Sequence, residues 1–133
     1  MRDERGMTLI EILISLTLLS IVSLAQIQSS LVAININVRN ELRDEAVSVA
    51  EQRINELRNT PFSDPFMQVN FPSPGVATEA AVTRKVRSVT CLFTIKRKVQ
   101  QVNADNRLVT LTVAWSYKNV PYQHTVSTVL SDL

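Results

Sequence analysis

The sequence predicts an α+β fold, with a long amino-terminal helix at about residues 7–58 whose carboxyl-terminal half packs on a small antiparallel sheet. Two observations support this prediction. Neither proline nor glycine occurs between Met7 and Thr60, and Pro61 then stops the helix. The carboxyl-terminal half is rich in β-branched residues, and one of its segments alternates apolar and polar positions.

The amino end contains an apolar segment with one unexpected charge. Residues 7–25 are almost all apolar or small hydroxyl residues, and their number matches the ~20 residues with which a helix crosses a bilayer. Glu11 lies within this segment, and no Lys, Arg or His accompanies it. A carboxylate at mid-membrane costs roughly 2.5–3.5 kcal/mol, so Glu11 is a candidate functional residue. A cut between Gly6 and Met7 would create an α-amino group one turn before Glu11, and that group, or the same group of a neighbouring copy, would reduce the cost.

Two other interpretations of this segment compete with the first. Ser23-Leu24-Ala25 ahead of Gln26 resembles the cleavage site of a secretory signal peptide. Against that interpretation, the leader MRDERG mixes acids with arginines, and Glu11 interrupts the apolar core. An ordinary uncleaved membrane anchor is the other alternative, and it leaves Glu11 unexplained.

Beyond the membrane segment, the predicted helix carries an apolar stripe that we expect to form part of the core. The members of the stripe are Leu31, Ile34, Val38, Leu42, Ala46, Val49, Ile54 and Leu57. The charged residues opposite the stripe are Arg39, Arg43, Asp44, Glu51 and Arg58.

The rest of the chain predicts a loop and then a sheet. Residues 60–80 hold four of the five prolines, and the three phenylalanines of this loop either pack on the core or form a subunit contact. Residues 82–102 predict one bent strand or two short ones, and Asn103–Asn106 predicts a turn. An alternating strand follows at 107–117, and a last strand opens at Pro121 and ends at about Leu130. The inward row of the alternating strand is Val109, Leu111, Val113, Trp115 and Tyr117.

The sequence offers little chemistry outside the amino end. Cys91 is the single cysteine, so an internal disulfide is excluded, and we expect a buried apolar residue there. His124, the single histidine, is expected on a strand surface. Since the residues show neither metal-ligand spacing nor a catalytic or phosphate-binding pattern, we expect no enzyme, cofactor, metal site or small-molecule substrate.

Six basic residues lie between Glu79 and Asp105 with no acid among them. They are Arg84, Lys85, Arg87, Lys96, Arg97 and Lys98. Such a cluster could bind nucleic acid or an acidic partner subunit. Strand alternation, however, places Arg84 on the face opposite Lys85 and Arg87, and a solvated strand edge that resists pairing is the simpler explanation.

The amino end resembles that of type IV pilin precursors. The resemblance rests on Gly6, an apolar residue, the run TLIE at 8–11 and the apolar helix that follows. It implies a type IV pilin fold, cleavage by a prepilin peptidase between Gly6 and Met7, and N-methylation of Met7. It also implies that Glu11 pairs with the terminal amine of an adjacent subunit during assembly. Met7 departs from the family, which most often has phenylalanine at this position.

Weaker resemblances lie further along the chain. Residues 82–86, 107–115 and 124–130 look like the closing strands of PilV-type minor pilins. Residues 50–58 resemble the end of the helix in minor pilins and in type II secretion pseudopilins. The disulfide-closed loop of many major pilins is missing, because the chain has one cysteine.

These resemblances imply a minor type IV pilin, a structural subunit that is incorporated into a pilus at the cell surface or primes its assembly. The implied partners are other pilin subunits, the prepilin peptidase and the bacterial inner membrane, with the carboxyl terminus in the periplasm. One alternative is a pseudopilin of a type II secretion system, similar to the GspI-type component. An alternative of another class is a membrane-anchored periplasmic binding module with DNA as a candidate ligand.

The same resemblances imply an organisation in five parts. The predicted parts are a leader peptide at 1–6, a transmembrane and filament-core segment at 7–27, a periplasmic helix at 28–59, the proline-rich loop at 60–80 and the sheet at 81–133.

Overall fold

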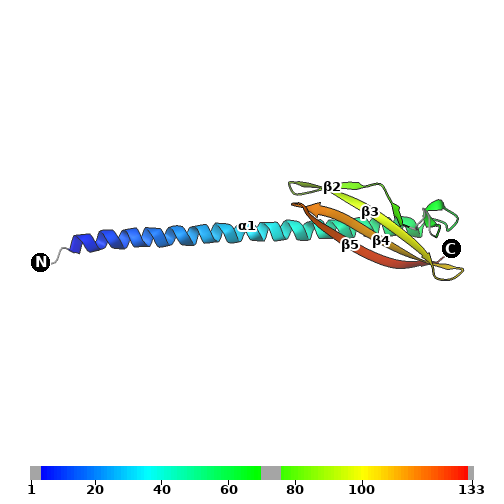
Figure 1. Ribbon diagram of the computed structural model, residues 1–133, viewed down its shortest axis with the longest axis horizontal. Helices are drawn as coiled ribbons and strands as arrows, with labels where there is room; N and C mark the ends of the chain where they lie inside the picture. The colour runs from blue at the N-terminus through cyan, green and yellow to red at the C-terminus, as the bar shows by residue number, and fades with distance from the viewer. Residues whose placement is uncertain (1–3, 70–75, 132–133) are drawn as a thin grey trace. The chain divides into compact units, whose positions relative to one another are not determined.

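The predicted α+β fold is confirmed by a computed structural model, which describes residues 4–69 and 76–131, with side chains from residue 8 onward (Figure 1). A single long helix precedes an antiparallel sheet of five strands. The elements are α1 (Glu4–Arg58), the short 3-10 helix η1 (Pro65–Met67), β1 (Val76–Thr78), β2 (Val82–Val86), β3 (Val89–Gln101), β4 (Asn106–Tyr117) and β5 (Val120–Ser131). The chain divides into two compact units, Met1–Asn37 and Val38–Leu133, and the second unit is called the head below.

The first unit consists of the amino-terminal part of α1. This helix begins at Glu4, three residues before the predicted start, and its apolar side chains from Leu9 to Ile36 are exposed. Four of its hydroxyl groups are satisfied within the helix: those of Thr17, Ser20, Ser23 and Ser30 each donate to the carbonyl four residues earlier, at 2.7–3.0 Å. Within the described residues, α1 is the one helix long and apolar enough to cross a membrane. Internal satisfaction of polar groups is what lipid requires of a spanning helix.

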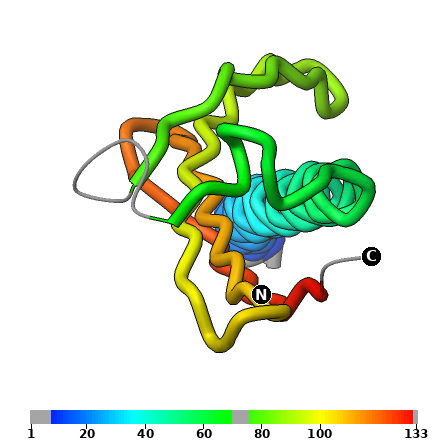
Figure 2. Tube along the Cα trace, turned by 90° about the vertical axis from the view of Figure 1, so that its right-hand side faces the viewer, coloured from blue at the N-terminus to red at the C-terminus, as the bar shows by residue number. Residues whose placement is uncertain are grey.

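In the head, the remaining part of α1 lies against one face of the sheet, as Figure 2 shows. The apolar stripe of the helix is buried in this contact. Apart from one adjacent pair, the buried residues of the helix recur every three or four positions and therefore share one side. They are Val38, Leu42, Ala46, Val49, Ala50, Ile54 and Leu57. The stripe was predicted to start at Leu31, but Leu31 and Ile34 are exposed in the first unit. Periodicity alone locates an apolar face of a helix, whereas burial also needs a second element that packs against the same turns of the helix.

The sheet supplies the other half of the core. The predicted inward row of β4 is confirmed, since four of its five members are buried and Tyr117 packs at the margin. The strand order is β1-β3-β4-β5, all neighbours are antiparallel, and β2 forms a hairpin with the first part of β3. Residues 82–102, predicted as one bent strand or two short ones, are two strands of unequal length, with a turn at Arg87.

The loop predicted at 60–80 has more structure than expected. It contains η1, whose first turn is capped by the Asp64 side chain accepting from the Phe66 backbone N–H at 2.8 Å, and the three-residue strand β1. Strands this short have no measurable alternation, which is why the sequence did not reveal β1. Phe62 is buried, and Arg107 stacks over its ring at 4.3 Å and donates to its carbonyl at 2.8 Å. The described part of the loop therefore packs on the core of the head. Phe71 lies outside the described residues.

Cys91 is buried, as predicted, and burial raises the pKa of its thiol above the ordinary value. A thiol with a raised pKa holds less thiolate at neutral pH, and thiolate is the reactive form. We expect the folded chain to react with iodoacetamide at pH 8 at least tenfold more slowly than the urea-unfolded chain. Mass spectrometry of timed samples measures this ratio, and equal rates in the two states would contradict the buried placement.

Candidate functional site

The amino end of α1 holds the predicted processing and assembly residues. Glu11 is exposed on the helix, and the described residues provide no ion pair for it. The first cation after the leader is Arg39, so no basic side chain of this segment lies near the carboxylate. Gly6 and Met7 belong to the helix backbone.

Helix geometry relates the predicted cleavage position to Glu11. Residues four apart lie on the same side of a helix, about 6 Å apart along the axis. An amine at Met7 would therefore stand over the same helix face as the Glu11 carboxylate. An unpaired acid on an otherwise apolar helix also suits a partner amine from a second subunit, because pairing removes part of the cost of the charge in lipid.

The six basic residues predicted as one binding cluster are not one surface. Arg84 pairs with Glu45 at 3.3 Å, and Arg87 pairs with Glu41, so both are engaged by acids of α1. The prediction that Arg87 lies opposite Arg84 is wrong, because β2 ends one residue before Arg87, which turns with a positive φ of 53°. Arg97 is buried. The other three members, Lys85, Lys96 and Lys98, are exposed, and the described residues include no ion-pair partner for them.

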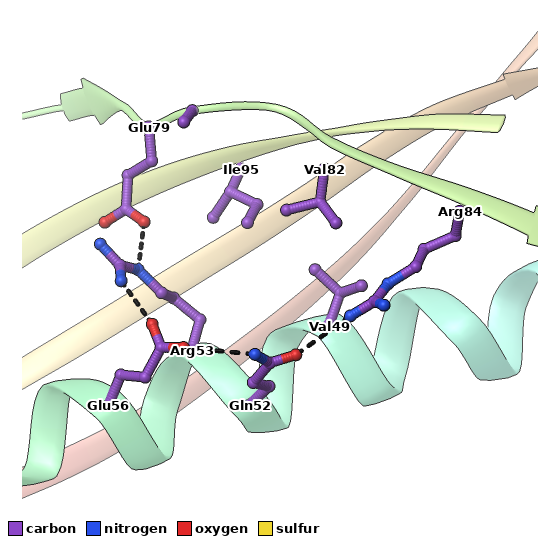
Figure 3. A pocket seen from close by; sticks show the side chains of 9 residues that line it. Val49, Gln52, Arg53, Glu56, Glu79, Val82, Arg84 and Ile95 are labelled. Carbon is purple, nitrogen blue, oxygen red and sulfur yellow. Dashed lines mark hydrogen bonds and ion pairs between the residues drawn. The ribbon is translucent and has the colours of Figure 1, made fainter.

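Arg97 belongs to a charged cluster in the head that the sequence did not reveal. The carboxylate of Glu79, just after β1, accepts a hydrogen bond from Arg97 at 2.7 Å. It accepts another from Arg53 of α1, which Figure 3 shows. The side chains of Arg97 and Glu79 are only 3% and 6% exposed. Glu56 also accepts from Arg53, and the guanidinium of Arg97 lies 5.0 Å from the centre of the Phe66 ring. We call Arg53, Glu56, Glu79 and Arg97 the Glu79 cluster.

Burial and pairing act in opposite directions on the charges of this cluster. Burial lowers the pKa of Arg97, and the nearby charge of Glu79 offsets part of this effect. Burial also works against the charge of Arg53, but its hydrogen bonds to Glu79 and Glu56, together with the charges of these acids, outweigh that effect and raise the pKa of Arg53. Hydrogen bonding from Arg53 lowers the pKa of the exposed Glu56. The buried part of the cluster therefore depends on Glu79 as the counter-charge of two arginines.

A signal for this cluster was present in the sequence. Ile95, Arg97 and Val99 occupy one row of β3, and its apolar members face the core. An arginine in a buried row needs a carboxylate, because an unpaired buried charge is costly. Which carboxylate supplies it could not be read from the sequence, since Glu79 and Arg53 reach Arg97 only when β1, α1 and β3 come together.

The other predicted residues of the head have clear positions. Trp115 is buried, as expected, and stacks on Tyr122 with ring centres 5.9 Å apart. His124 is not on the solvated face of β5. It is half-buried in the row that faces α1, where it lines a cleft with Arg39 and Arg43. Among the described residues, no group of three or more His, Cys, Asp or Glu side chains could hold a metal ion.

The comparisons with known proteins point to the amino end. Residues 1–25 match the family model of the prokaryotic N-terminal methylation motif, which covers Gly6, Met7 and Glu11. Neither the curated proteins nor the solved structures gave a match. The motif precedes a long apolar helix and a small antiparallel sheet, which is the arrangement of type IV pilins. These findings support a type IV pilin-like family for the chain.

Proposed function

We propose that the chain is a minor type IV pilin that a prepilin peptidase cleaves between Gly6 and Met7 and that is then N-methylated at Met7. The observation that carries the proposal is the methylation motif at residues 1–25, joined to an apolar helix on which Glu11 has no described partner. Proteins with this motif and fold serve as structural subunits, so the proposed activity is assembly rather than catalysis.

In the proposed mechanism, the precursor is held in the inner membrane with its head in the periplasm. Residues 1–6 form the cytoplasmic leader, 7–27 cross the membrane, and 28–59 continue as periplasmic helix. The loop at 60–80 and the sheet at 81–133 complete the periplasmic part. After cleavage, Glu11 of one subunit binds the terminal amine of the next, which aligns the apolar helices as they leave the lipid for a pilus. Packing of apolar helices then replaces the lipid around each segment.

A pseudopilin of a type II secretion system is the second candidate, favoured by the same motif and by the absence of a disulfide-closed loop in a chain with one buried cysteine. Deletion of the gene separates the two candidates. Loss of surface pili with normal protein secretion supports the minor pilin, and the converse phenotype supports the pseudopilin.

Processing provides the direct test of the proposal. We expect the mature chain to begin at Met7 and to carry one additional methyl group, as measured by intact mass and amino-terminal sequencing of membrane-extracted protein. Gly6→Val is expected to leave the full-length precursor in the membrane, because a side chain at this position obstructs the peptidase. The matched control is Ala25→Leu, which should mature normally. If the mature chain instead begins at Gln26, or if Ala25→Leu blocks maturation, the segment is a secretory signal peptide and the proposal is wrong.

A further inference from the structure

A cleft in the head, at the edge of the sheet, combines cations, aromatic rings and hydrogen-bond donors without an acid. Its volume is about 320 Å³, and it lies between α1 and β5. The residues that line it are Arg39, Asn40, Arg43, Trp115, Tyr122, Gln123 and His124. This composition suits an anionic ligand with some apolar surface, because the stacked rings of Trp115 and Tyr122 offer an apolar floor.

Arg39 and Arg43 are available to such a ligand. Neither guanidinium forms a hydrogen bond or ion pair with any residue that the structure describes. Most other arginines of the head bind an acceptor within it, namely Arg53, Arg84, Arg87, Arg97 and Arg107. Two cations four residues apart on one helix face also repel each other, and an anion between them removes that repulsion.

The indole group of Trp115 lines the same cleft. Its Nε1–H is buried and has no acceptor among the described residues. The whole residue is only 6% exposed. Buried donors are nearly always paired, so this unpaired one is unusual. Because the nitrogen has almost no accessible surface, a ligand in the cleft would reach it only if the ring moved.

The cleft also reaches the free edge of the sheet. In strand order β5 is last, and β4 is its one partner among the described strands (Figure 1). The two-residue turn Lys118–Asn119, with φ of 52° and 63°, makes Tyr117 and Val120 a hydrogen-bonded pair. Bonded and non-bonded pairs alternate along an antiparallel ladder, so the backbone groups of 121, 123, 125, 127 and 129 point away from β4.

This free edge is open to pairing. Pro121 has no N–H, so it cannot donate a hydrogen bond to an added strand at the first outward position. The residues from Gln123 to Val129 include no further proline and no Lys, Arg, Asp or Glu. The side chain of Gln123 is exposed on the solvated face of β5. Because β5 is the edge strand, Gln123 also borders the cleft on the other face of the sheet. A strand added here would turn every second side chain toward α1.

We propose that the cleft is a docking site for an extended acidic segment of a partner protein, which pairs with the free edge of β5 and places a carboxylate between Arg39 and Arg43. The positive charges of Arg39 and Arg43 favour an acidic residue in the partner segment. The backbone groups at 123, 125 and 127 that point away from β4 favour an extended conformation of that segment. The inference does not rest on cleavage at Gly6, since all the residues involved lie in the head.

The full chain in nanodiscs, labelled with ¹⁵N, provides the test, because Trp115 is the only tryptophan and its indole N–H gives a single resonance. The probe is the peptide acetyl-Val-Thr-Glu-Thr-Val-amide, whose Glu and Val side chains share one face. We expect a saturable shift of the indole resonance. Binding should weaken about tenfold when Gln replaces Glu in the peptide, and about tenfold in Arg39→Gln/Arg43→Gln. Arg58→Gln, which changes another helix arginine without a described ion pair, should bind like the parent chain.

Three further results decide between the proposal and simpler sites. A peptide with methylated backbone nitrogens at its edge-facing positions should lose at least tenfold in affinity, and unchanged affinity would overturn strand pairing. Acetate at equal concentration should leave the resonance in place, and an equal shift would reduce the cleft to a small-anion site. No shift with the peptide up to its solubility limit, or equal binding of the Gln peptide, would overturn the proposal.

Discussion

Glu79→Ala is expected to lower the free energy of unfolding of the head by about 3–5 kcal/mol, which is the usual cost of removing one member of a buried ion pair. The reason is that Arg97, only 3% exposed, would keep its charge and lose its counter-charge. Arg53 would lose the same partner but is 27% exposed, so water and Glu56 compensate it in part. Urea unfolding followed by the fluorescence of Trp115 measures the change.

Two control variants separate charge from packing in this experiment. Glu51→Ala removes an exposed acid of α1 and should change the stability by at most about 0.5 kcal/mol. Arg97→Met in the Glu79→Ala background removes the uncompensated charge and should recover more than half of the loss, because an apolar side chain can replace a buried ion pair at little cost. A loss below about 1 kcal/mol for Glu79→Ala would show that the Glu79 cluster is not the counter-charge arrangement described above.

Glu11→Ala and Glu11→Gln are expected to be processed normally and yet to be nearly absent from filaments. Cleavage depends on Gly6 and the apolar segment, whereas the proposed docking of one subunit on the next depends on the carboxylate. Removal of the charge should also favour membrane insertion, by up to roughly 2.5–3.5 kcal/mol if the side chain sits at mid-membrane. The effects on insertion and on assembly therefore have opposite signs, which distinguishes an assembly residue from a simple anchor.

The measurement is the ratio of each variant in sheared filaments to the same variant in membranes. Ser15→Ala is the matched control, since it changes a polar side chain one turn further along α1 and should assemble normally. Crosslinking from a residue next to Met7 to neighbouring subunits gives a more direct reading for a scarce subunit. Normal recovery of Glu11→Ala in filaments, with an unchanged crosslinking pattern, would contradict the role proposed for the carboxylate.

Features that depend on neighbours along the chain could be predicted from the sequence. The end of α1 at Arg58 follows from the absence of proline and glycine before Pro61, and the inward row of β4 follows from strict alternation. The motif at the amino end is equally local, and the family model covers the same residues. The absence of charged residues in β5 could be read from the sequence. The position of β5 at the edge of the sheet could not.

Tertiary structure alone decided where the charges go. Arg84, Arg87 and Arg97 form one basic run in the sequence, yet α1 engages the first two, and Glu79 engages the third in the core. The same packing places Arg39 and Arg43 of α1 beside β5, where they have no described acid. The physical reason is that periodicity fixes only which face of its own element a side chain occupies. An ion pair or a cleft also requires a second element that lies beside that face, and this element can be tens of residues away in the chain.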